Sequence, residues 1–350
     1  MNQNQNLKIE SLHQIIFNLC ADDYNELLKK MNLKQKVVNE AANALHKIIF
    51  RERHLPSGYV KNGKTPAGRQ KYINTHKSKS ISDSYQSIVR YTKKSYEQWL
   101  MFIKCMIYGV SLKMSASEVG ISTTTAFAWR HKVIEALKDY QANPKLTGEI
   151  QMDETYFLLN MKGPWKDKKM PRPAKKKGES AVLRGISNEH VCVLVAVDEN
   201  DQILTKIIGQ GNPWKNDIYQ CIKDKIQVGS HITSDSKSSY RDIAIKLKCN
   251  ITQIPSGKHT KNEYSLGVIN NYHSELKTWF RRFRGVSTKH LEGYLLWFRF
   301  TKYLKYQLEF DKHANTTLKY AISNPVVIKS KDIHQRDWPV NIFLPYQYLS

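Results

Sequence analysis

One aspartate lies in the middle of a predicted strand, where a carboxylate is unusual, and a second lies at the end of a later strand, where aspartates are common. Asp153 is in the middle of Glu149–Phe157, whose roughly alternating apolar and polar residues predict a β-strand. Asp235 comes near the end of a short strand predicted at His231–Ser236. A carboxylate inside a strand is unfavourable unless it is paired or binds a metal ion. With a polar side chain from a nearby helix, the two aspartates could hold one or two Mg²⁺ ions for phosphoryl transfer.

A polar and basic ridge accompanies an apolar stripe on the helix predicted within Ser265–Gly285. The stripe has helical spacing and consists of Ile269, Tyr272, Leu276, Phe280 and Phe283. The ridge beside it consists of Asn270, His273, Lys277, Arg281 and Arg284. This arrangement suits a helix that lines a catalytic groove, and a solvated flank is the alternative.

The segments around the aspartates predict a mixed α/β sheet. His190–Val197 is almost entirely apolar, as expected of a strand covered on both faces. Gln202–Gly209 returns as the second arm of a hairpin, and Asn250–Ile254 is a later short strand. Helices are predicted around residues 216–226, 237–247 and 286–306. A three-stranded meander followed by alternating helices and strands therefore forms the predicted core.

Upstream of this core, Ser115–Lys132 has the pattern of a helix-turn-helix. The first helix ends at Gly120, and Ser122 or Thr123 can begin the second. The second helix would present four polar residues to a DNA major groove, namely Thr123, Thr124, Arg130 and Lys132. An ordinary helical hairpin is the alternative.

Two further segments are strongly basic. Residues 51–95 predict turns and short β-hairpins in which basic residues alternate with tyrosines, and residues 161–184 predict a proline-rich loop. The candidate phosphate contacts in these segments are Lys61, Lys64, Arg69, Lys71, Lys175, Lys176 and Lys177. A solvated linker and a solvated loop are the alternatives.

The overall composition favours a nucleic-acid partner. The 350 residues include 55 Lys and Arg against 31 Asp and Glu, a net charge of +24. No apolar run is long enough to span a bilayer, and the polar N-terminus does not resemble a signal peptide. Five scattered cysteines suit a reducing cytoplasm and lack metal-ligand spacing, so no zinc is expected.

Several motifs, in order, resemble those of the ISXO-type bacterial insertion-sequence transposases. The resemblance extends over about residues 58–303 and includes the Val60–Tyr72 segment and the helix-turn-helix. Its most specific motifs are Met152–Tyr156, Ser234-Asp235, Ile269–Lys277 and Arg281–Leu291.

The resemblance implies a ribonuclease-H-like core with a DDE-type triad. In one branch of the family, Asn replaces the third acidic residue and Lys follows seven positions later, as Asn270 and Lys277 do. Asp153, Asp235 and Asn270 would then bind Mg²⁺ or Mn²⁺, and Lys277 would hold a phosphate, with His273 and Arg281 also on DNA. Because Asn is a weaker ligand than Glu, Glu154 or a substrate phosphate would support a second ion.

One feature departs from the family. A zinc ribbon with two cysteine pairs usually opens such chains, but Leu55–Gly58 and Ile73–His76 occupy the corresponding positions here. Either this module folds without zinc, or this copy of the family has decayed.

The predicted organisation has five parts. These are a helical segment at 1–50, a degenerate ribbon-like module at 51–95, the helix-turn-helix region at 96–145, the catalytic core at 146–305 and a tail at 306–350. The predicted function is a DNA transposase that binds double-stranded terminal repeats as a homodimer or higher oligomer, associated with the bacterial nucleoid. A decayed transposase that only binds DNA and a structure-selective nuclease are the alternatives.

Overall fold

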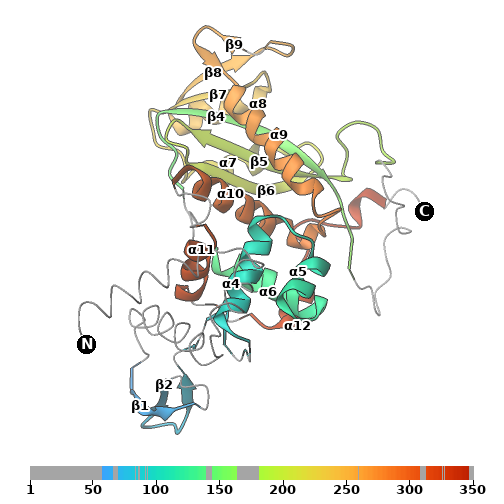
Figure 1. The fold of residues 1–350 in the computed structure, drawn as a ribbon. Helices are drawn as coiled ribbons and strands as arrows, with labels where there is room; N and C mark the ends of the chain where they lie inside the picture. The colour runs from blue at the N-terminus through green and yellow to red at the C-terminus, as the bar shows by residue number, and fades with distance from the viewer. Residues whose placement is uncertain are drawn as a thin grey trace, which may run out of the picture. The chain divides into compact units, whose positions relative to one another are not determined.

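The computed structural model of the chain describes residues 57–65, 70–82, 84–85, 87–90, 92, 94–138, 144–163, 181–258, 260–307, 313–324, 326 and 328–346 (Figure 1). The predicted helix of residues 1–50 and most of the predicted loop at 161–184 lie outside these ranges. The chain divides into two compact units. The first comprises Met1–Asp139 and Thr301–Ile333, and the second comprises Tyr140–Phe300 and His334–Ser350.

The second unit is built on a mixed five-stranded sheet. Its strands are β4 (Glu149–Leu158), β5 (His190–Asp198), β6 (Ile203–Gln210), β7 (His231–Asp235) and β8 (Asn250–Ile254). They lie in the order β6-β5-β4-β7-β8. β5 is antiparallel to both of its neighbours, whereas β4, β7 and β8 are parallel. The predicted ribonuclease-H-like arrangement, a meander followed by two parallel strands, is therefore confirmed.

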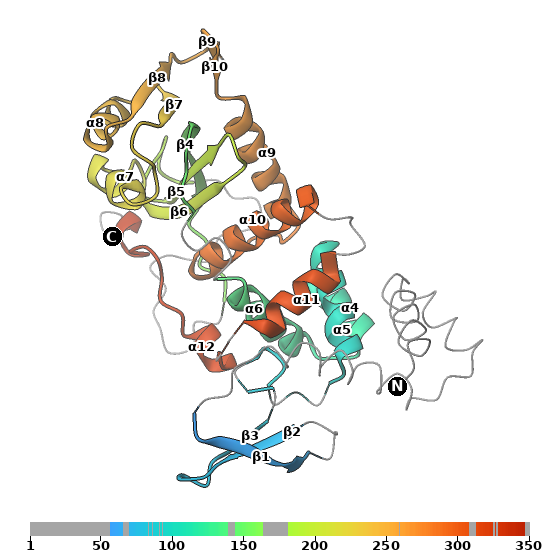
Figure 2. The same ribbon diagram turned by 90° about the vertical axis from the view of Figure 1, so that its left-hand side faces the viewer.

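Helices cover both faces of this sheet. Figure 2 shows α7 (Lys215–Ile222) and α8 (Ser238–Leu247) on one face and α9 (Gly267–Arg281) on the other. On the α7 and α8 face, Ile150 and Met152 from β4 join Ile218 and Ile243 in one buried cluster. On the α9 face, the rings of Phe157 and Phe280 lie 4.8 Å apart. Because neighbouring strand residues point to opposite faces, β4 contributes to both layers.

The remaining elements of the second unit follow the sheet along the chain. Two short strands, β9 (Thr260–Lys261) and β10 (Tyr264–Ser265), form a small hairpin before α9. The 3-10 helix η1 (Thr288–His290) and α10 (Leu291–Gln307) follow it, and another 3-10 turn, η3, spans Leu344–Tyr346. Trp279 of α9 packs edge-on against Trp297 of α10, with ring centroids 5.0 Å apart. The buried surface of α9 is therefore shared between the sheet and α10.

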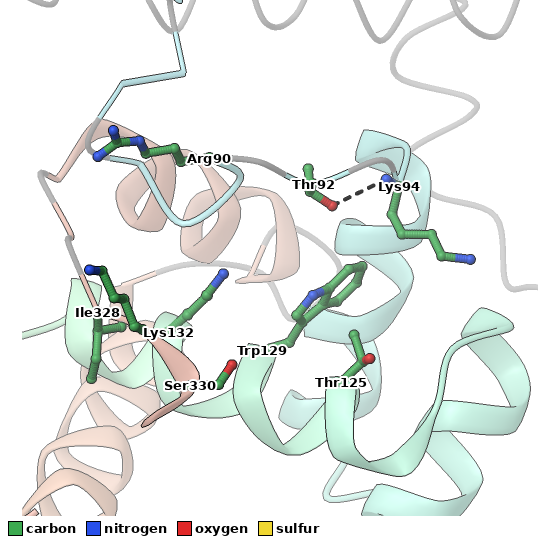
Figure 3. A pocket seen from close by; sticks show the side chains of 9 residues that line it. Arg90, Thr92, Lys94, Thr125, Trp129, Lys132, Ile328 and Ser330 are labelled. Atoms are coloured by element: carbon green, nitrogen blue, oxygen red, sulfur yellow. Dashed lines mark hydrogen bonds between the residues drawn. The ribbon is translucent and has the colours of Figure 1, made fainter. Parts of the chain in front are cut away.

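The first unit contains a β-hairpin and the predicted helix-turn-helix. β1 (Tyr59–Lys64), β2 (Gln70–Asn74) and β3 (Ser80–Ser82) form an antiparallel sheet. α4 (Tyr96–Ile107), α5 (Leu112–Val119) and α6 (Thr123–Ala136) follow. Trp129 of α6 stacks on Trp99 of α4 with ring centroids 3.7 Å apart, and it shares one side of α6 with Thr125 (Figure 3).

The C-terminal part of the chain completes this first unit. α11 (His313–Ser323) packs against α4 and α6 and buries Leu318 and Ile322, and α12 (Ser330–His334) follows. The Asn324 side-chain amide donates to the Ala136 carbonyl at the end of α6, at 2.8 Å. None of the helices that the structure describes has the length and apolar character needed to cross a lipid bilayer.

Candidate active site

The sheet brings the two candidate aspartates to neighbouring positions on adjacent strands. In the parallel pairing of β4 with β7, Gln151 lies opposite Thr233. Asp153 and Asp235 come two residues later on their strands, so they share a sheet face with that pair. This is the face that α9 covers. Strand order and register therefore place the two aspartates on one face of neighbouring strands.

Burial is the largest cause of the unusual electrostatics at Asp153. It raises the pKa of this carboxyl to about 7, because a side chain that is only 24% exposed loses much of its hydration. The negative charges of Glu154 and Asp235 raise the pKa further, against a hydrogen bond from the Glu154 backbone and the charge of Lys237. The site therefore has an excess of negative charge that a divalent cation would compensate.

Helix α9 approaches Asp153 from above the sheet. The Ile269 backbone N–H donates to the Gln151 side-chain oxygen at 3.1 Å, which fixes the first turn of the helix on β4. One turn later, His273 Nδ1 lies 3.7 Å from Asp153 Oδ2. Burial lowers the pKa of His273 to about 4, and the nearby charge of Lys277 adds to this shift. His273 is therefore neutral at pH 7 and contributes no positive charge beside Asp153.

Asn270 and Lys277 lie on the solvent side of the same helix. Asn270 precedes His273 by three residues and Lys277 follows it by four, which is the spacing of neighbours on a helix surface. Both side chains are exposed. Among the described residues, no three His, Cys, Asp or Glu side chains are grouped closely enough to hold a metal ion. The two carboxylates are oxygen donors that suit Mg²⁺ or Mn²⁺, and the Asn270 amide remains a predicted third ligand.

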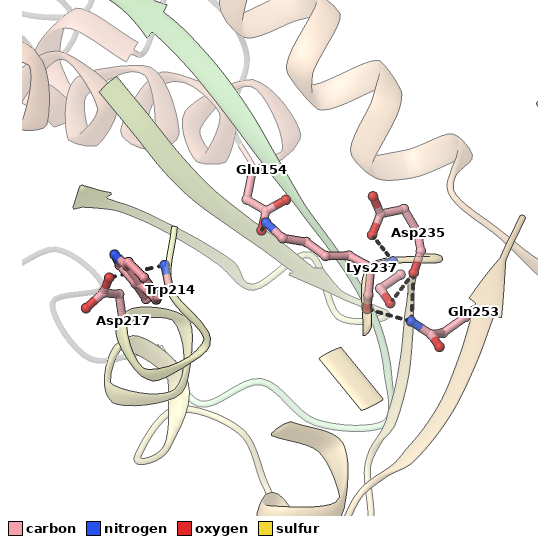
Figure 4. A network of polar contacts seen from close by, with 7 residues as sticks. Glu154, Trp214, Asp217, Asp235, Lys237 and Gln253 are labelled. Carbon is pink, nitrogen blue, oxygen red and sulfur yellow. Dashed lines mark hydrogen bonds and ion pairs between the residues drawn. The ribbon is translucent and has the colours of Figure 1, made fainter. Parts of the chain in front are cut away.

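Glu154 points to the opposite face of the sheet and already has a partner. The Lys237 ammonium donates to Glu154 Oε1 at 2.8 Å, and the Glu154 side chain is only 5% exposed (Figure 4). The expectation that Glu154 supports a second metal ion is therefore wrong. Alternation along β4 separates it from the Asp153 side, and its charge is engaged by Lys237.

Lys237 and Gln253 are two residues of this site that the sequence did not reveal. The Lys237 backbone N–H donates to Asp235 Oδ1 at 3.1 Å. The Gln253 amide donates to the backbone carbonyls of Asp235 and Lys237 at 3.1 and 2.8 Å (Figure 4). Lys237 thus connects two strands: its ammonium pairs with Glu154 on β4, and its backbone N–H holds Asp235 at the end of β7. The position of Lys237, two residues after an aspartate at the end of a strand, was the one sequence feature that could have indicated its role.

The helix-turn-helix has the expected turn, but one predicted contact is wrong. Gly120 ends α5 at a φ of 67°, and the Ser122 hydroxyl accepts the Thr125 backbone N–H at the start of α6. Thr123 and Thr124 are exposed, and Lys132 is half-buried. Arg130 is only 3% exposed and donates to the Val110 carbonyl at 3.3 Å, so it faces the protein interior.

The other predicted DNA contacts differ in exposure. Lys61, Lys64 and Arg281 are exposed, whereas Lys71 is half-buried. His273 is only 8% exposed and lies against Asp153, so its burial argues against the predicted contact with DNA. The remaining contacts lie outside the described residues, and these are Arg69, Lys175, Lys176 and Lys177.

Comparison with known proteins gave one family match. Residues 145–302 match the ISXO2-like transposase domain. No curated protein sequence matches the chain.

Solved structures of DNA-transfer complexes show a weak likeness. A pre-cleavage Mos1 transpososome is 10% identical and covers 95% of this chain and 97% of its own, with a TM-score of 0.25. The alignment with the Mos1 mariner paired-end complex with Mn has 11% identity and a TM-score of 0.26, and it covers 97% of this chain and 98% of the Mos1 chain. A simian T-cell lymphotropic virus intasome bound to PP2A regulatory subunit B56 gamma is 13% identical and covers 68% and 75%, with a TM-score of 0.25. TM-scores this low establish no shared overall arrangement.

Proposed function

Because residues 145–302 form an ISXO2-like transposase domain, we propose that the protein is a DNA transposase that cuts and joins the ends of an insertion sequence. The observation that supports this most is the position of Asp153 and Asp235 on adjacent parallel strands, facing α9. Phosphoryl transfer with divalent cations needs two such carboxylates at one point.

In the proposed reaction, Asp153, Asp235 and the Asn270 amide oxygen would hold one or two Mg²⁺ or Mn²⁺ ions. Bound there, such ions would supply activation of the attacking oxygen and stabilisation of the leaving oxygen. His273, which is neutral at pH 7, orients the Asp153 carboxylate without neutralising it. Lys277 provides an exposed positive charge for a phosphate beside the scissile bond. Water first cleaves a strand at the element end, and the freed 3′-hydroxyl then attacks a target phosphodiester.

The first unit would recognise the terminal inverted repeats. Thr123 and Thr124 are exposed at the start of α6, which is the end of a recognition helix that meets base edges. The remaining proposed contacts bind phosphates, namely Lys61, Lys64, Arg69, Lys71, Lys132, Lys175, Lys176, Lys177 and Arg281. Both element ends must be held together for transfer, so we expect a homodimer or higher oligomer on DNA.

A strand-transfer assay tests this proposal. Duplexes made from the DNA that flanks the coding region are incubated with the protein and Mg²⁺ or Mn²⁺. Asp153→Asn and Asp235→Asn should abolish cleavage and joining, because each removes a charged ligand at nearly constant volume. Asp224→Asn removes an exposed carboxylate of the same unit and should retain activity.

The products distinguish the alternatives. Joined products that need both aspartates support a transposase. Cleavage of branched DNA without joining would favour a structure-selective nuclease. Binding without cleavage would favour a regulator, which the missing zinc-ribbon cysteines also suggest.

A further inference from the structure

The first unit contains a basic pocket of about 350 Å³ beside the helix-turn-helix (Figure 3). Three parts of the chain that are distant in sequence line it. These are Arg90 with Thr92 and Lys94, one side of α6, and residues 328–330. The lining residues that matter for its chemistry are Arg90, Lys94, Thr125, Lys132, Lys329 and Ser330. We call this the basic pocket.

The charge of the basic pocket has one sign. Arg90, Lys94, Lys132 and Lys329 are cationic, and none of the described residues that line the pocket is acidic. Burial lowers the pKa of Lys132, because its ammonium has lost part of its hydration. In the part of the chain that the structure describes, Lys132 and Lys329 have no ion-pair partner. A bound anion would be attracted to these cations and would compensate the lost hydration of Lys132.

The hydrogen bonds around the basic pocket fix its walls. The Lys94 ammonium donates to the Gly120 carbonyl at 3.0 Å, which ties Lys94 to the turn of the helix-turn-helix. The Lys329 backbone N–H donates to Asp332 Oδ2 at 2.8 Å and thereby fixes the start of α12. Asp332 itself does not line the pocket. The pocket is therefore held in place from both sides before any ligand arrives.

The position of the basic pocket on α6 indicates its ligand. Thr125 lines the pocket and directly follows the exposed Thr123 and Thr124. When the start of a recognition helix enters the major groove, the residues beside it lie over the sugar-phosphate backbone. Cations and hydroxyls together are the groups that bind phosphate oxygens.

We propose that the basic pocket binds a backbone phosphate of duplex DNA, with Lys132 from α6 and Lys329 from the C-terminal segment as its main cationic contacts. This rests on the proposed DNA-binding function. It assigns residues 328–330 to the DNA interface, a role that their sequence did not indicate. A phosphate contact of this kind sets the position of α6 on the duplex and adds affinity without reading bases.

The test measures binding to a short random-sequence duplex over a range of salt concentrations. Losing one phosphate contact should lower the slope of log affinity against log salt by about 0.9. We expect this for Lys132→Met, which keeps the buried stem, and for Lys329→Gln on the exposed segment, and a larger change for the double variant. Lys138→Met and Lys331→Gln are the matched controls, because both are exposed lysines of the same segments outside the pocket.

The outcomes separate the pocket from the function it rests on. Reduced slopes for the pocket variants, with smaller changes for the controls, support the assignment. If the wild type binds DNA but the slopes of Lys329→Gln and of the folded double variant are unchanged, the phosphate assignment of the pocket is wrong and the DNA-binding proposal stands. If inorganic phosphate stabilises the wild type but not the double variant while DNA binding is unchanged, the site takes a free phosphate and the DNA assignment is wrong. A wild-type protein that binds no duplex overturns both proposals.

Discussion

Replacing Asp153 by Asn should stabilise the protein while abolishing its proposed activity. The pKa of Asp153 is raised from an ordinary 3.8 to about 7, chiefly by burial. Each pKa unit corresponds to about 1.4 kcal/mol, so the ionised carboxylate costs up to about 4 kcal/mol. Because 24% of the side chain is still exposed to solvent, we expect Asp153→Asn to raise the free energy of unfolding by about 2–4 kcal/mol.

The sign of the pH dependence follows from the raised pKa. The folded protein binds the Asp153 proton more tightly than the unfolded chain, so this group stabilises the fold below its unfolded pKa of 3.8. That stability is lost as the pH rises towards 7. Asn cannot ionise and suffers no such loss. The stability difference between Asp153→Asn and wild type should therefore grow from near zero around pH 4 to its full value above pH 7.

Urea unfolding in EDTA at pH 5 and pH 8 measures this difference. Adding Mg²⁺ or Mn²⁺ at pH 8 should reduce the stability difference between Asp153→Asn and the wild type, because a bound cation stabilises the ionised carboxylate of the wild type only. Asp224→Asn should change stability by less than about 0.5 kcal/mol at either pH, because its carboxylate is exposed. A pH-independent difference, or a wild type more stable than Asp153→Asn at pH 8 in EDTA, would refute the reasoning.

Three further changes test other parts of the molecule. Lys237→Met should destabilise the second unit by about 2–4 kcal/mol in urea unfolding, because it leaves the Glu154 carboxylate buried and unpaired. The double variant with Glu154→Gln should recover most of this lost stability. Ser122→Ala removes the N-terminal cap of α6 and should cost about 1 kcal/mol; an unchanged melting temperature would argue against the cap. Gly148→Ala should destabilise by about 1–2 kcal/mol, since φ is 66° there and the new Cβ would lie 1.9 Å from Glu199 Oε1; circular dichroism melting checks this.

The sheet was largely predictable because its strands have recognisable patterns: β5 is a nearly continuous apolar run, and β4 alternates roughly between apolar and polar residues. Asn250–Ile254 was expected as a strand and is β8, and the hairpin that begins at His190 is β5 and β6. Runs of this length, bounded by turn residues, leave little choice of secondary structure. Register and strand order then decide which side chains meet, and sequence periodicity carries no information about partners. The likeness of motifs supplied that information for Asp153 and Asp235.

The environment of α9 was predicted only in part. The stripe through Ile269, Tyr272 and Leu276 is buried as expected, but Trp279 and His273 are buried as well. A periodic pattern identifies the face towards one neighbour, whereas α9 contacts both the sheet and α10. A helix between two neighbours buries residues that a single-stripe reading assigns to solvent.

The Glu154–Lys237 pair and the place of α11 could not have been predicted. Both depend on contacts between segments far apart in the chain, Glu154 with Lys237 and Asn324 with Ala136. Glu154 next to Asp153 looked like a possible metal ligand, and only the alternation along β4 in the folded sheet shows that it faces away.

The packing of α11 against α4 and α6 has a consequence for how the molecule is made. The ribosome releases residues 96–136 early, but α11 at His313–Ser323 emerges only after the whole sheet of the other unit has been synthesised. Until then, the surface of α4 and α6 that packs against Leu318 and Ile322 of α11 remains exposed to solvent. A growing chain thus completes the five-stranded sheet before the first unit is complete, and a truncation before His313 would leave an exposed, aggregation-prone surface on α4 and α6.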